Sequence, residues 1–227
     1  MESGKNCLIV ALSGASGQIY GIRLLELLRA ARDQSGADSG QTPIVPTIET
    51  HLVISEAAGI AIAQETDYTP RQVEALADVC YRPRDIGAAI ASGSFATLGM
   101  VVAPCSIKTL SAIANCYSSD LISRAADVQL KEGRPLLLLV RETPLHLGHI
   151  RLMAQAAEAG AIIMPPVPAF YSRPQSIDDI VNGTVGRLLA RLGIENELYY
   201  RWLGTRRAQE DSTFANPSGR LAEGSNL

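Results

Sequence analysis

The sequence predicts an α/β fold, a three-layer sandwich in which helices cover both faces of a mainly parallel sheet. Apolar runs of strand length recur along the chain, and amphipathic stretches of helical length lie between them. Continuous apolar strands that alternate with helices are typical of a parallel sheet buried on both faces, with right-handed crossovers. The expected strands are Leu8–Leu12, His51–Ile54, Met100–Ala103, Leu136–Val140 and Ala161–Met164.

Length and composition fit one domain of this class. The chain has 227 residues, and no linker divides it into comparable halves, so we expect a single domain over residues 1–204. The formal net charge of -3 lacks the concentrated positive field that nucleic-acid binding requires. No apolar run approaches the roughly 20 residues that cross a bilayer. We therefore expect no nucleic-acid partner, no membrane partner and a cytoplasmic location.

Two segments depart from the alternation of strands and helices. Residues 33–47 are polar and rich in turn-forming residues, which predicts a surface loop before the second strand. Residues 205–227 lose the hydrophobic period, which predicts a flexible tail.

The first strand ends in a cluster of small residues, SGASG, which directly follows Leu12. Gly14 and Gly17 lack a β-carbon, so the backbone can turn sharply and a bulky ligand can approach it closely. Ser13 and Ser16 add hydroxyl groups at the mouth of a helix whose first amides are unpaired and whose dipole favours an anion. Serine is also a preferred N-cap, and glycine is common in such turns. These residues alone leave a phosphate site and a purely structural turn equally open.

Similar residues follow the other expected strands, where ligands of parallel α/β sheets bind. Ser55 follows the second strand, and Ser106 begins a hydroxyl-rich turn as an expected N-cap with Thr109 in the next helical turn. Arg141 and Glu142 follow the strand that ends at residue 140. Ser16 and Ser106 can be helix caps only, and Glu142 can simply pair with Arg141.

Further charged and hydroxyl side chains occur on the later elements. Arg124 and Lys131 share one face of a predicted helix, and a solvated or salt-bridged face is the usual explanation for such a pair. Tyr171 lies on a proline-rich loop, and Arg187 lies on the final predicted helix.

Taken in order from Cys7 to Trp202, these stretches closely resemble the UbiX-type flavin prenyltransferases. That family makes prenylated FMN, the cofactor of partner decarboxylases of the UbiD type. The resemblance implies a Rossmann-like, flavodoxin-like fold, with reduced FMN and dimethylallyl monophosphate as the two substrates. It also implies a homo-oligomer, expected to be a dodecamer, that delivers its product to a UbiD-type decarboxylase.

The resemblance also implies roles for individual residues. The residues implied to bind FMN are Gly14, Ala15, Ser16, Ser55, Ser106, Ile107, Lys108, Thr109 and Arg141. Those implied to hold dimethylallyl monophosphate, some of them from a neighbouring subunit, are Arg124, Lys131, Tyr171 and Arg187. The implied catalytic residues are Ser16, Glu65 and Glu142.

The chemistry of the implied substrate residues fits a departing phosphate. Negative charge grows on the phosphate oxygens as the carbon–oxygen bond breaks, and arginine, lysine and tyrosine side chains can stabilise it. No Asp-rich metal motif occurs, so we expect transfer without a metal ion. The H-x-x-H pair formed by His146 and His149 lacks a third ligand at a recognisable spacing, which favours a packed or hydrogen-bonded role.

The expected reaction joins N5 of reduced FMN to the allylic carbon that loses phosphate, then closes a ring onto C6 of the flavin. Ring closure needs one proton delivered to the alkene and another removed from the flavin ring. Glu142, with Ser16 and the released phosphate, is the first candidate for this transfer, and Glu65 is the second.

The cysteines and the single tryptophan allow several interpretations. Cys105 precedes a helix N-terminus, a position that lowers the pKa of a thiol, but no motif places a base beside it, so we expect it to line the flavin turn. Trp202 is either a core anchor or a lid over the allyl group. Without a C-x-x-C pair, the expected state is a set of reduced and mostly buried thiols at Cys7, Cys80, Cys105 and Cys116.

Two other functions remain open beside the prenyltransferase. The nearest is an FMN-dependent decarboxylase of cysteinyl peptides or phosphopantothenoylcysteine, which resembles this family in fold but uses a catalytic histidine. The other is a non-catalytic FMN-binding regulatory subunit, which would need no residues for an allyl phosphate. One departure from the family pattern also stands out, because KERR is common there and this chain has KEGR, with Gly133 in place of an arginine.

Overall fold

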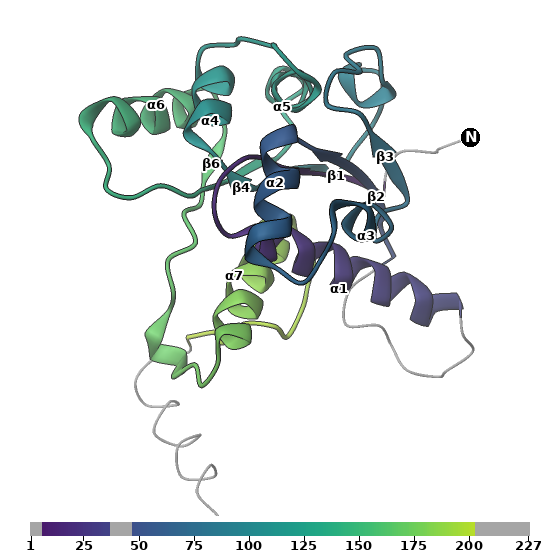
Figure 1. Cartoon of the computed structure of the whole chain (residues 1–227), viewed down its shortest axis with the longest axis vertical. Helices are drawn as coiled ribbons and strands as arrows, with labels where there is room; N and C mark the ends of the chain where they lie inside the picture. The colour runs from purple at the N-terminus through teal and green to yellow at the C-terminus, as the bar shows by residue number, and fades with distance from the viewer. Residues whose placement is uncertain (1–5, 37–46, 203–227) are drawn as a thin grey trace, which may run out of the picture.

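A computed structural model describes residues 6–36 and 47–202 of the chain (Figure 1). Its centre is a six-stranded sheet, in the order β3-β2-β1-β4-β5-β6, in which all neighbouring strands are parallel. The strands are β1 (Cys7–Leu12), β2 (Glu49–Ile54), β3 (Val79–Tyr81), β4 (Gly99–Cys105), β5 (Leu136–Val140) and β6 (Ile162–Ile163). The chain runs outward from β1 to β3 and then returns to β4, so the topological switch point lies between β1 and β4.

Helices cover both faces of this sheet and complete the three layers (Figure 1). The helices on one face are α1 (Gln18–Gly36), α2 (Glu56–Glu65), α3 (Pro70–Glu74) and α7 (Ile177–Arg191). Those on the other face are α4 (Ile107–Ala114), α5 (Leu121–Lys131) and α6 (Leu147–Glu158). Short 3-10 turns occur at Ala89–Ala91 and Phe170–Ser172.

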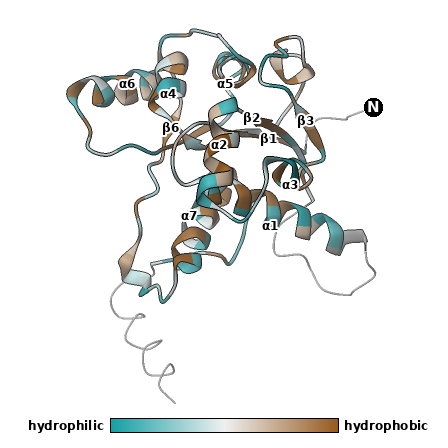
Figure 2. Ribbon diagram, in the orientation of Figure 1, coloured by the Kyte–Doolittle hydropathy of each residue, from teal (hydrophilic) through white to brown (hydrophobic). Residues whose placement is uncertain are grey.

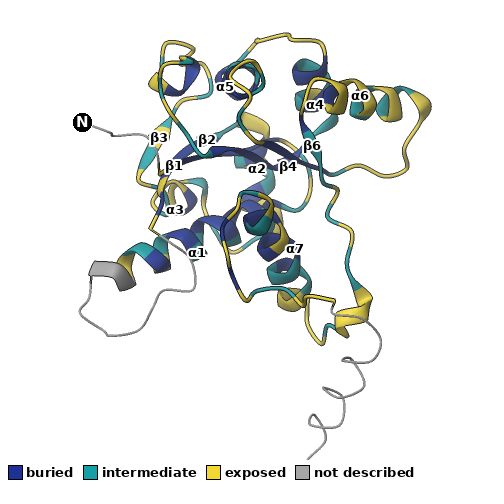
Figure 3. Ribbon diagram, turned by 180° about the vertical axis from the view of Figure 1, so that it is seen from behind, coloured by how far each residue is buried: buried dark blue, intermediate teal, exposed yellow. Residues whose placement is uncertain are grey.

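The central strands are buried on both faces, as their apolar runs predict. All of β1 is buried, and the strands at the centre of the sheet are hydrophobic (Figure 2) and lie between covering helices (Figure 3). Leu8 and Val10 belong to the core under α1 and α7, whereas Ile9 and Ala11 belong to the core under α4 and α5. Because side chains alternate along a strand, one apolar run supplies both cores.

The predicted fold class is confirmed, and the differences concern the edges of the sheet. β3 was missed because it has only three residues, none of them buried, so no apolar run marks it. β6 is shorter than the expected strand Ala161–Met164. At both edges a strand has only one neighbour, and a weak pattern in the sequence is enough to form it.

The expected loop at residues 33–47 begins later than its composition indicates. Helix α1 continues to Gly36, and within it Asp33 forms an ion pair with Arg29 one helical turn earlier, at 3.7 Å. Such i,i+4 pairs stabilise a helix, and here the pair extends α1 into the polar segment. Residues 37–46 and the expected tail at 205–227 lie outside the described residues.

The cysteines differ from expectation in their burial. Cys7 and Cys105 are buried in strands, but Cys80 and Cys116 are exposed, because one lies on the edge strand β3 and the other in the turn after α4. All four thiols are free. As for membrane spans, no helix within residues 6–36 or 47–202 is both long enough and apolar enough to cross a bilayer.

Candidate active site

The turn after β1 lies at the topological switch point and depends on its glycines. A β-carbon on Gly14 would lie 2.4 Å from the β-carbon of Ala57 in α2, so no larger residue fits there. Gly17 has a φ of 95°, in the region that favours glycine. Gly14 and Ser16 are exposed, while the residues on either side of the turn are buried. The backbone is therefore open to a ligand on one side and closely packed on the other.

Ser13 has a structural role that differs from the expected one. Its side chain is 1% exposed, its hydroxyl donates to the carbonyl oxygen of Pro104 at 2.9 Å, and it accepts from the backbone N–H of Ser106 at 2.8 Å. The hydroxyl is buried between two turns and does not face the helix mouth, because both of its hydrogen-bonding roles are taken by β4 and its turn. Ser13 thus ties the turn after β1 to the turn after β4.

Glu65 reaches the same turn from the end of α2. Its Oε2 atom accepts from the backbone N–H of Gly17 at 2.7 Å and lies 3.4 Å from the backbone N of Gln18. These are the first amides of α1, which have no partner inside the helix. A carboxylate at this position is also favoured by the helix dipole. We call residues 13–16 the GAS turn. The structure therefore places Glu65 beside the GAS turn, although the two are far apart in the sequence.

The serines after β2 and β4 are both N-caps, which was expected for Ser106 alone. Ser55 accepts from the backbone N–H of Ala58 at 3.1 Å, and Ser106 accepts from that of Thr109 at 3.3 Å. Because the strands are parallel, helices α1, α2 and α4 begin at the same edge of the sheet, α1 after the turn at residues 13–17 and the other two directly after their caps. Their dipoles add positive potential there, which suits a phosphate. Capping and anion binding are compatible at this edge.

Arg141 and Glu142 complete this edge beyond β5. The backbone N–H of Arg141 donates to the carbonyl oxygen of Cys105 at 3.0 Å. Burial raises the pKa of Tyr20, in the first turn of α1, and the nearby positive charge of Arg141 opposes that rise. Glu142 is exposed and accepts from the backbone N–H of Thr143 at 2.9 Å. Among the described side chains Glu142 forms no ion pair with Arg141, so simple pairing does not explain it. We call residues 13–17, 55, 65, 106–109 and 141–142 the strand-end site.

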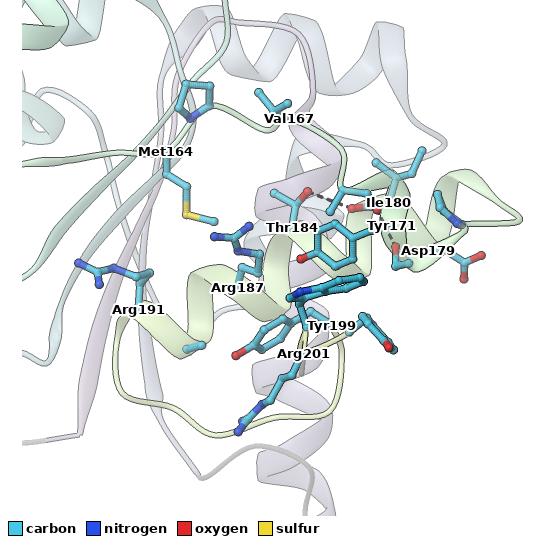
Figure 4. A pocket seen from close by; sticks show the side chains of 18 of the residues that line it. Met164, Val167, Tyr171, Asp179, Ile180, Thr184, Arg187, Arg191, Tyr199 and Arg201 are labelled. Carbon is cyan, nitrogen blue, oxygen red and sulfur yellow. Dashed lines mark hydrogen bonds between the residues drawn. The ribbon is translucent and has the colours of Figure 1, made fainter. Parts of the chain in front are cut away.

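A cavity of about 710 Å³ lies between α7 and the segments that follow β6 and α7 (Figure 4). Tyr171, Arg187 and Trp202 line it. The rings of Tyr171 and Trp202 are arranged edge to face, with their centroids 5.7 Å apart. Trp202 is 51% exposed, which excludes the core-anchor interpretation. We call this space, with Tyr171, Arg187, Tyr199, Tyr200 and Trp202 among its walls, the aromatic cavity.

The charge of Arg187 is available to a ligand in the aromatic cavity. Arg187 forms no ion pair with any side chain of the described residues. Asp179, a possible partner on the same helix, accepts instead from the backbone N–H groups of Gln175 and Ser176, at 2.8 and 3.0 Å. A cation beside aromatic rings fits a ligand that joins an anionic group to an apolar one.

Arg124 and Lys131 lie on α5 and do not join Tyr171 and Arg187 within one chain. Arg124 pairs with Asp127 at 3.0 Å, and Lys131 pairs with Glu132 at 2.5 Å. Helix α5 packs on the face of the sheet opposite α7 (Figure 1). Both side chains therefore form ion pairs, as the usual explanation of two such residues on one helix face predicts. Only a neighbouring copy can bring these residues to the aromatic cavity.

Comparison with known proteins decides between the candidate families. Residues 1–189 match the Flavoprotein family. The chain is 59% identical over 199 residues to the flavin prenyltransferase UbiX of Escherichia coli (strain K12), which covers 87% of this chain and 98% of that relative. The chain belongs to the UbiX family of flavin prenyltransferases.

Solved structures of UbiX family members share the fold. AnUbiX (PadA1), in complex with FMN and dimethylallyl pyrophosphate, has a TM-score of 0.80 at 44% identity and covers 88% of this chain and 99% of its own. A dodecameric FMN-dependent UbiX-like decarboxylase from Escherichia coli O157:H7 has a TM-score of 0.79 at 44% identity and covers 87% of this chain and 100% of its own. The flavodoxin-like, parallel α/β fold is that of the UbiX family.

In this member of the UbiX family, the other nucleophile and metal candidates have structural explanations. Burial raises the pKa of the Cys105 thiol to about 12, so the neutral thiol persists at physiological pH despite the helix that follows. His146 caps α6 by accepting from the N–H of Gly148 at 3.0 Å, and its ring packs on His149 with centroids 3.6 Å apart. In the described part of the chain, no three His, Cys, Asp or Glu residues are grouped to hold a metal ion.

Two features of this UbiX-type site were missed in the sequence. One is the buried link through Ser13, because a hydrogen bond to a turn 91 residues away leaves no local signal. The other is Gln18, which is fully buried and hydrogen-bonded to the carbonyls of the GAS turn. Nothing in the sequence distinguishes a buried glutamine at the start of an amphipathic helix from one that is exposed to solvent.

Proposed function

We propose that this chain attaches a dimethylallyl group, taken from dimethylallyl monophosphate, to N5 and C6 of reduced FMN and releases phosphate. The observation that carries the proposal is the presence of two unlike sites, a glycine-backed turn at the switch point and an aromatic cavity that contains Arg187. The first suits a flavin and the second an apolar group bearing an anion. The relative AnUbiX, which binds FMN and dimethylallyl pyrophosphate, supports this combination.

The strand-end site fits FMN by its own chemistry. FMN offers ring acceptors and an anionic phosphate, and this edge offers backbone N–H groups without partners, three helix N-termini and one arginine. The missing β-carbon of Gly14 lets α2 pack against the back of the turn at Ala57, and the exposed front of the turn stays open to a flat ring. The proposed FMN-binding residues are Gly14, Ala15, Ser16, Ser55, Ser106, Ile107, Lys108, Thr109 and Arg141.

The aromatic cavity is proposed to hold the prenyl phosphate. Arg187 and Tyr171 would stabilise the growing negative charge as phosphate leaves, and the rings would cover the allyl group and exclude water. Arg124 and Lys131 would come from a neighbouring subunit, because α5 lies on the opposite face of the sheet. The proposal therefore requires a homo-oligomer, and we propose the dodecamer seen for the Escherichia coli O157:H7 relative.

We rank the candidates for proton transfer by the contacts of their side chains. Reduced FMN supplies the nucleophilic nitrogen when bound. Glu142 is exposed at the end of β5 and only one of its oxygens has a partner, so it can exchange a proton. The Ser16 hydroxyl has no partner among the described residues and can relay one. The Oε2 atom of Glu65 is held by the amide of Gly17, so we rank Glu65 second and assign it also to positioning the turn.

We further propose a metal-independent, cytoplasmic enzyme whose product passes to a UbiD-type decarboxylase. The cations Arg124, Lys131 and Arg187 take the place that Mg²⁺ has in many phosphate-transferring sites. Free thiols at all four cysteines suit a reducing compartment. Activity is expected to survive EDTA, and loss with EDTA followed by rescue with Mg²⁺ would contradict the proposed role of these cations.

The decisive experiment supplies the protein with reduced FMN and dimethylallyl monophosphate under anaerobic conditions. The expected product is a flavin whose mass has increased by one five-carbon unit, together with stoichiometric phosphate. The double variant Glu142→Gln/Ser16→Ala should bind FMN yet make this product slowly. If the wild-type protein binds both molecules and the flavin mass does not change, the proposed function is wrong.

A further inference from the structure

Gln18 is buried beneath the GAS turn and binds two of its carbonyl groups. Its side chain is fully buried, and its Nε2 atom donates to the carbonyl oxygens of Ser13 at 2.9 Å and of Ala15 at 2.7 Å. Both hydrogens of the amide are thus used on the turn that precedes its own helix.

The planarity of the peptide bond gives these two hydrogen bonds a consequence on the other side of the turn. In a trans peptide the C=O and the following N–H point in opposite directions. Since the carbonyls of Ser13 and Ala15 point inward to Gln18, the N–H groups of Gly14 and Ser16 point outward. Neither N–H has a hydrogen-bond partner among the described residues, and Gly14 and Ser16 are both exposed.

We propose that Gln18 is a positioning residue for the flavin, because it orients the peptide groups of the GAS turn so that the N–H groups of Gly14 and Ser16 donate to acceptor atoms of FMN. This inference rests on the proposed function and adds to it a residue outside the binding surface. Gln18 itself does not touch FMN.

The orientation of the amide is fixed by its surroundings. A flipped side chain would direct its oxygen at two carbonyl oxygens, so the donor must face the turn. The Oε1 atom is left buried without a partner, which is unfavourable for a polar group. An apolar residue of the same size would avoid that unfavourable burial. It would leave the carbonyl of Ala15 without its hydrogen bond and that of Ser13 with only the backbone N–H of Ala15, at 2.8 Å. Glutamine at this position therefore orients the peptide groups of the turn, and its unpartnered Oε1 atom lowers the stability of the core.

The test compares variants of similar size in the full-length protein. Gln18→Met fills the same space without hydrogen bonds, and Gln129→Met is the matched control, because Gln129 is equally buried and also donates to a backbone carbonyl, that of Ala125 at 3.4 Å. We expect FMN to bind about tenfold more weakly to Gln18→Met, as loss of well-oriented donors implies. Gln129→Met should bind FMN as the wild type does, although it removes the hydrogen bonds of Gln129 with Ala125 and Thr97.

Gln18→Glu adds a measurement that a purely structural role would not change. An ionised carboxylate repels the two carbonyl oxygens, whereas the protonated form can donate to one of them. Relative to wild type at each pH, FMN affinity of Gln18→Glu should therefore recover as the pH falls, and that of Gln18→Met should not. Riboflavin titrated in parallel shows whether the two N–H groups serve the ring or the phosphate, since it lacks the phosphate.

The possible outcomes separate this inference from the proposed function. If folded Gln18→Met binds FMN as tightly as wild type, or if Gln129→Met weakens FMN equally, the role of Gln18 is refuted. If Gln18→Met does not fold, Gln18→Glu decides, and a constant affinity ratio across pH refutes the inference. If the wild-type protein binds FMN but forms no prenylated flavin, the proposed function fails while the assignment of Gln18 to FMN binding stands.

Discussion

The strand-end site and the aromatic cavity differ in how much of their structure one chain supplies. Around the strand-end site Ser13 is 1% exposed, Gln18 is fully buried, and hydrogen bonds of Ser13 tie the turn after β1 to the end of β4 and the turn that follows it. Around the aromatic cavity Val167 is 76% exposed, Tyr171 47% and Trp202 51%. The first is held by buried hydrogen bonds, and the second has large apolar side chains that nothing in residues 6–36 or 47–202 covers.

This difference gives the two sites different physical requirements. The strand-end site is fixed by folding, because the parallel sheet aligns the ends of β1, β2, β4 and β5. Three cations are expected to bind the prenyl phosphate. Of these, only Arg187 lines the aromatic cavity, and it forms no ion pair among the described residues. Arg124 and Lys131 form ion pairs on α5, on the opposite face of the sheet. Flavin binding should thus be a property of the folded chain, and prenyl transfer a property of the assembly.

The largest expected effect concerns cations that belong to different subunits. In one chain the double change Lys131→Ala/Arg187→Ala should lower kcat/KM by about 10²–10⁴, since each charge-assisted contact contributes roughly 1.5–3 kcal/mol. Co-expression of the two single variants should restore part of the activity, because some sites then combine intact Lys131 from one subunit with intact Arg187 from another.

The control for this experiment is co-expression of two differently tagged copies of Arg187→Ala, which should restore nothing. No recovery in purified mixed assemblies of the two single variants would show that both residues serve a site within one chain, or none.

The next effect separates the two sites within a single variant. Arg187→Ala should leave the Kd for FMN unchanged and weaken saturation by dimethylallyl monophosphate about ten- to a hundredfold. Arg187→Lys should recover only part of this loss, because an ammonium retains the charge without the bidentate geometry. Titrations of both substrates on one preparation, with its thermal midpoint, provide the measurement. Unchanged substrate saturation in a folded variant would remove Arg187 from the site.

A smaller effect on FMN binding is expected from a change in the packing between the GAS turn and α2. Gly14→Ala places a β-carbon where that of Ala57 already lies, and overpacking of this kind costs about 1–3 kcal/mol. The variant should unfold at a lower temperature and bind FMN more weakly, whereas saturation by the prenyl phosphate should change less. The compensating double change Gly14→Ala/Ala57→Gly should recover stability. If the double variant is no more stable than the single one, contact with Ala57 does not explain Gly14.

The sequence contained enough information for the fold and for the local parts of the site. Caps such as Ser106 and strand ends such as Arg141 are local features, and the structure confirms both. The links through Ser13 and Gln18 could not be predicted, because they depend on which backbone carbonyls face inward after the chain has folded. The burial of Cys105, which raises its pKa to about 12, likewise depends on both layers of helices.

The smallest expected effect concerns the sheet and leaves both sites untouched. His51 in β2 is 4% exposed, its Nδ1 lies 2.8 Å from the hydroxyl oxygen of Tyr81, and its Nε2 lies 3.2 Å from Oε1 of Glu49. Burial lowers the pKa of His51, and the hydrogen bond to Glu49 only partly opposes this. A histidine whose pKa is lower in the folded state binds a proton more readily when unfolded.

The stability of the sheet should therefore be constant above the unfolded pKa of about 6.5 and should fall as the pH drops below it. Denaturant midpoints measured from about pH 8 to about pH 5 should show this loss, and His51→Gln should reduce the slope. Emission from Trp202, the single tryptophan, reports the aromatic cavity over the same range and should change only with global unfolding, because no histidine lines that cavity. An equal slope in His51→Gln would assign the acid sensitivity to another group, and an earlier change at Trp202 would show that the aromatic cavity opens before the sheet.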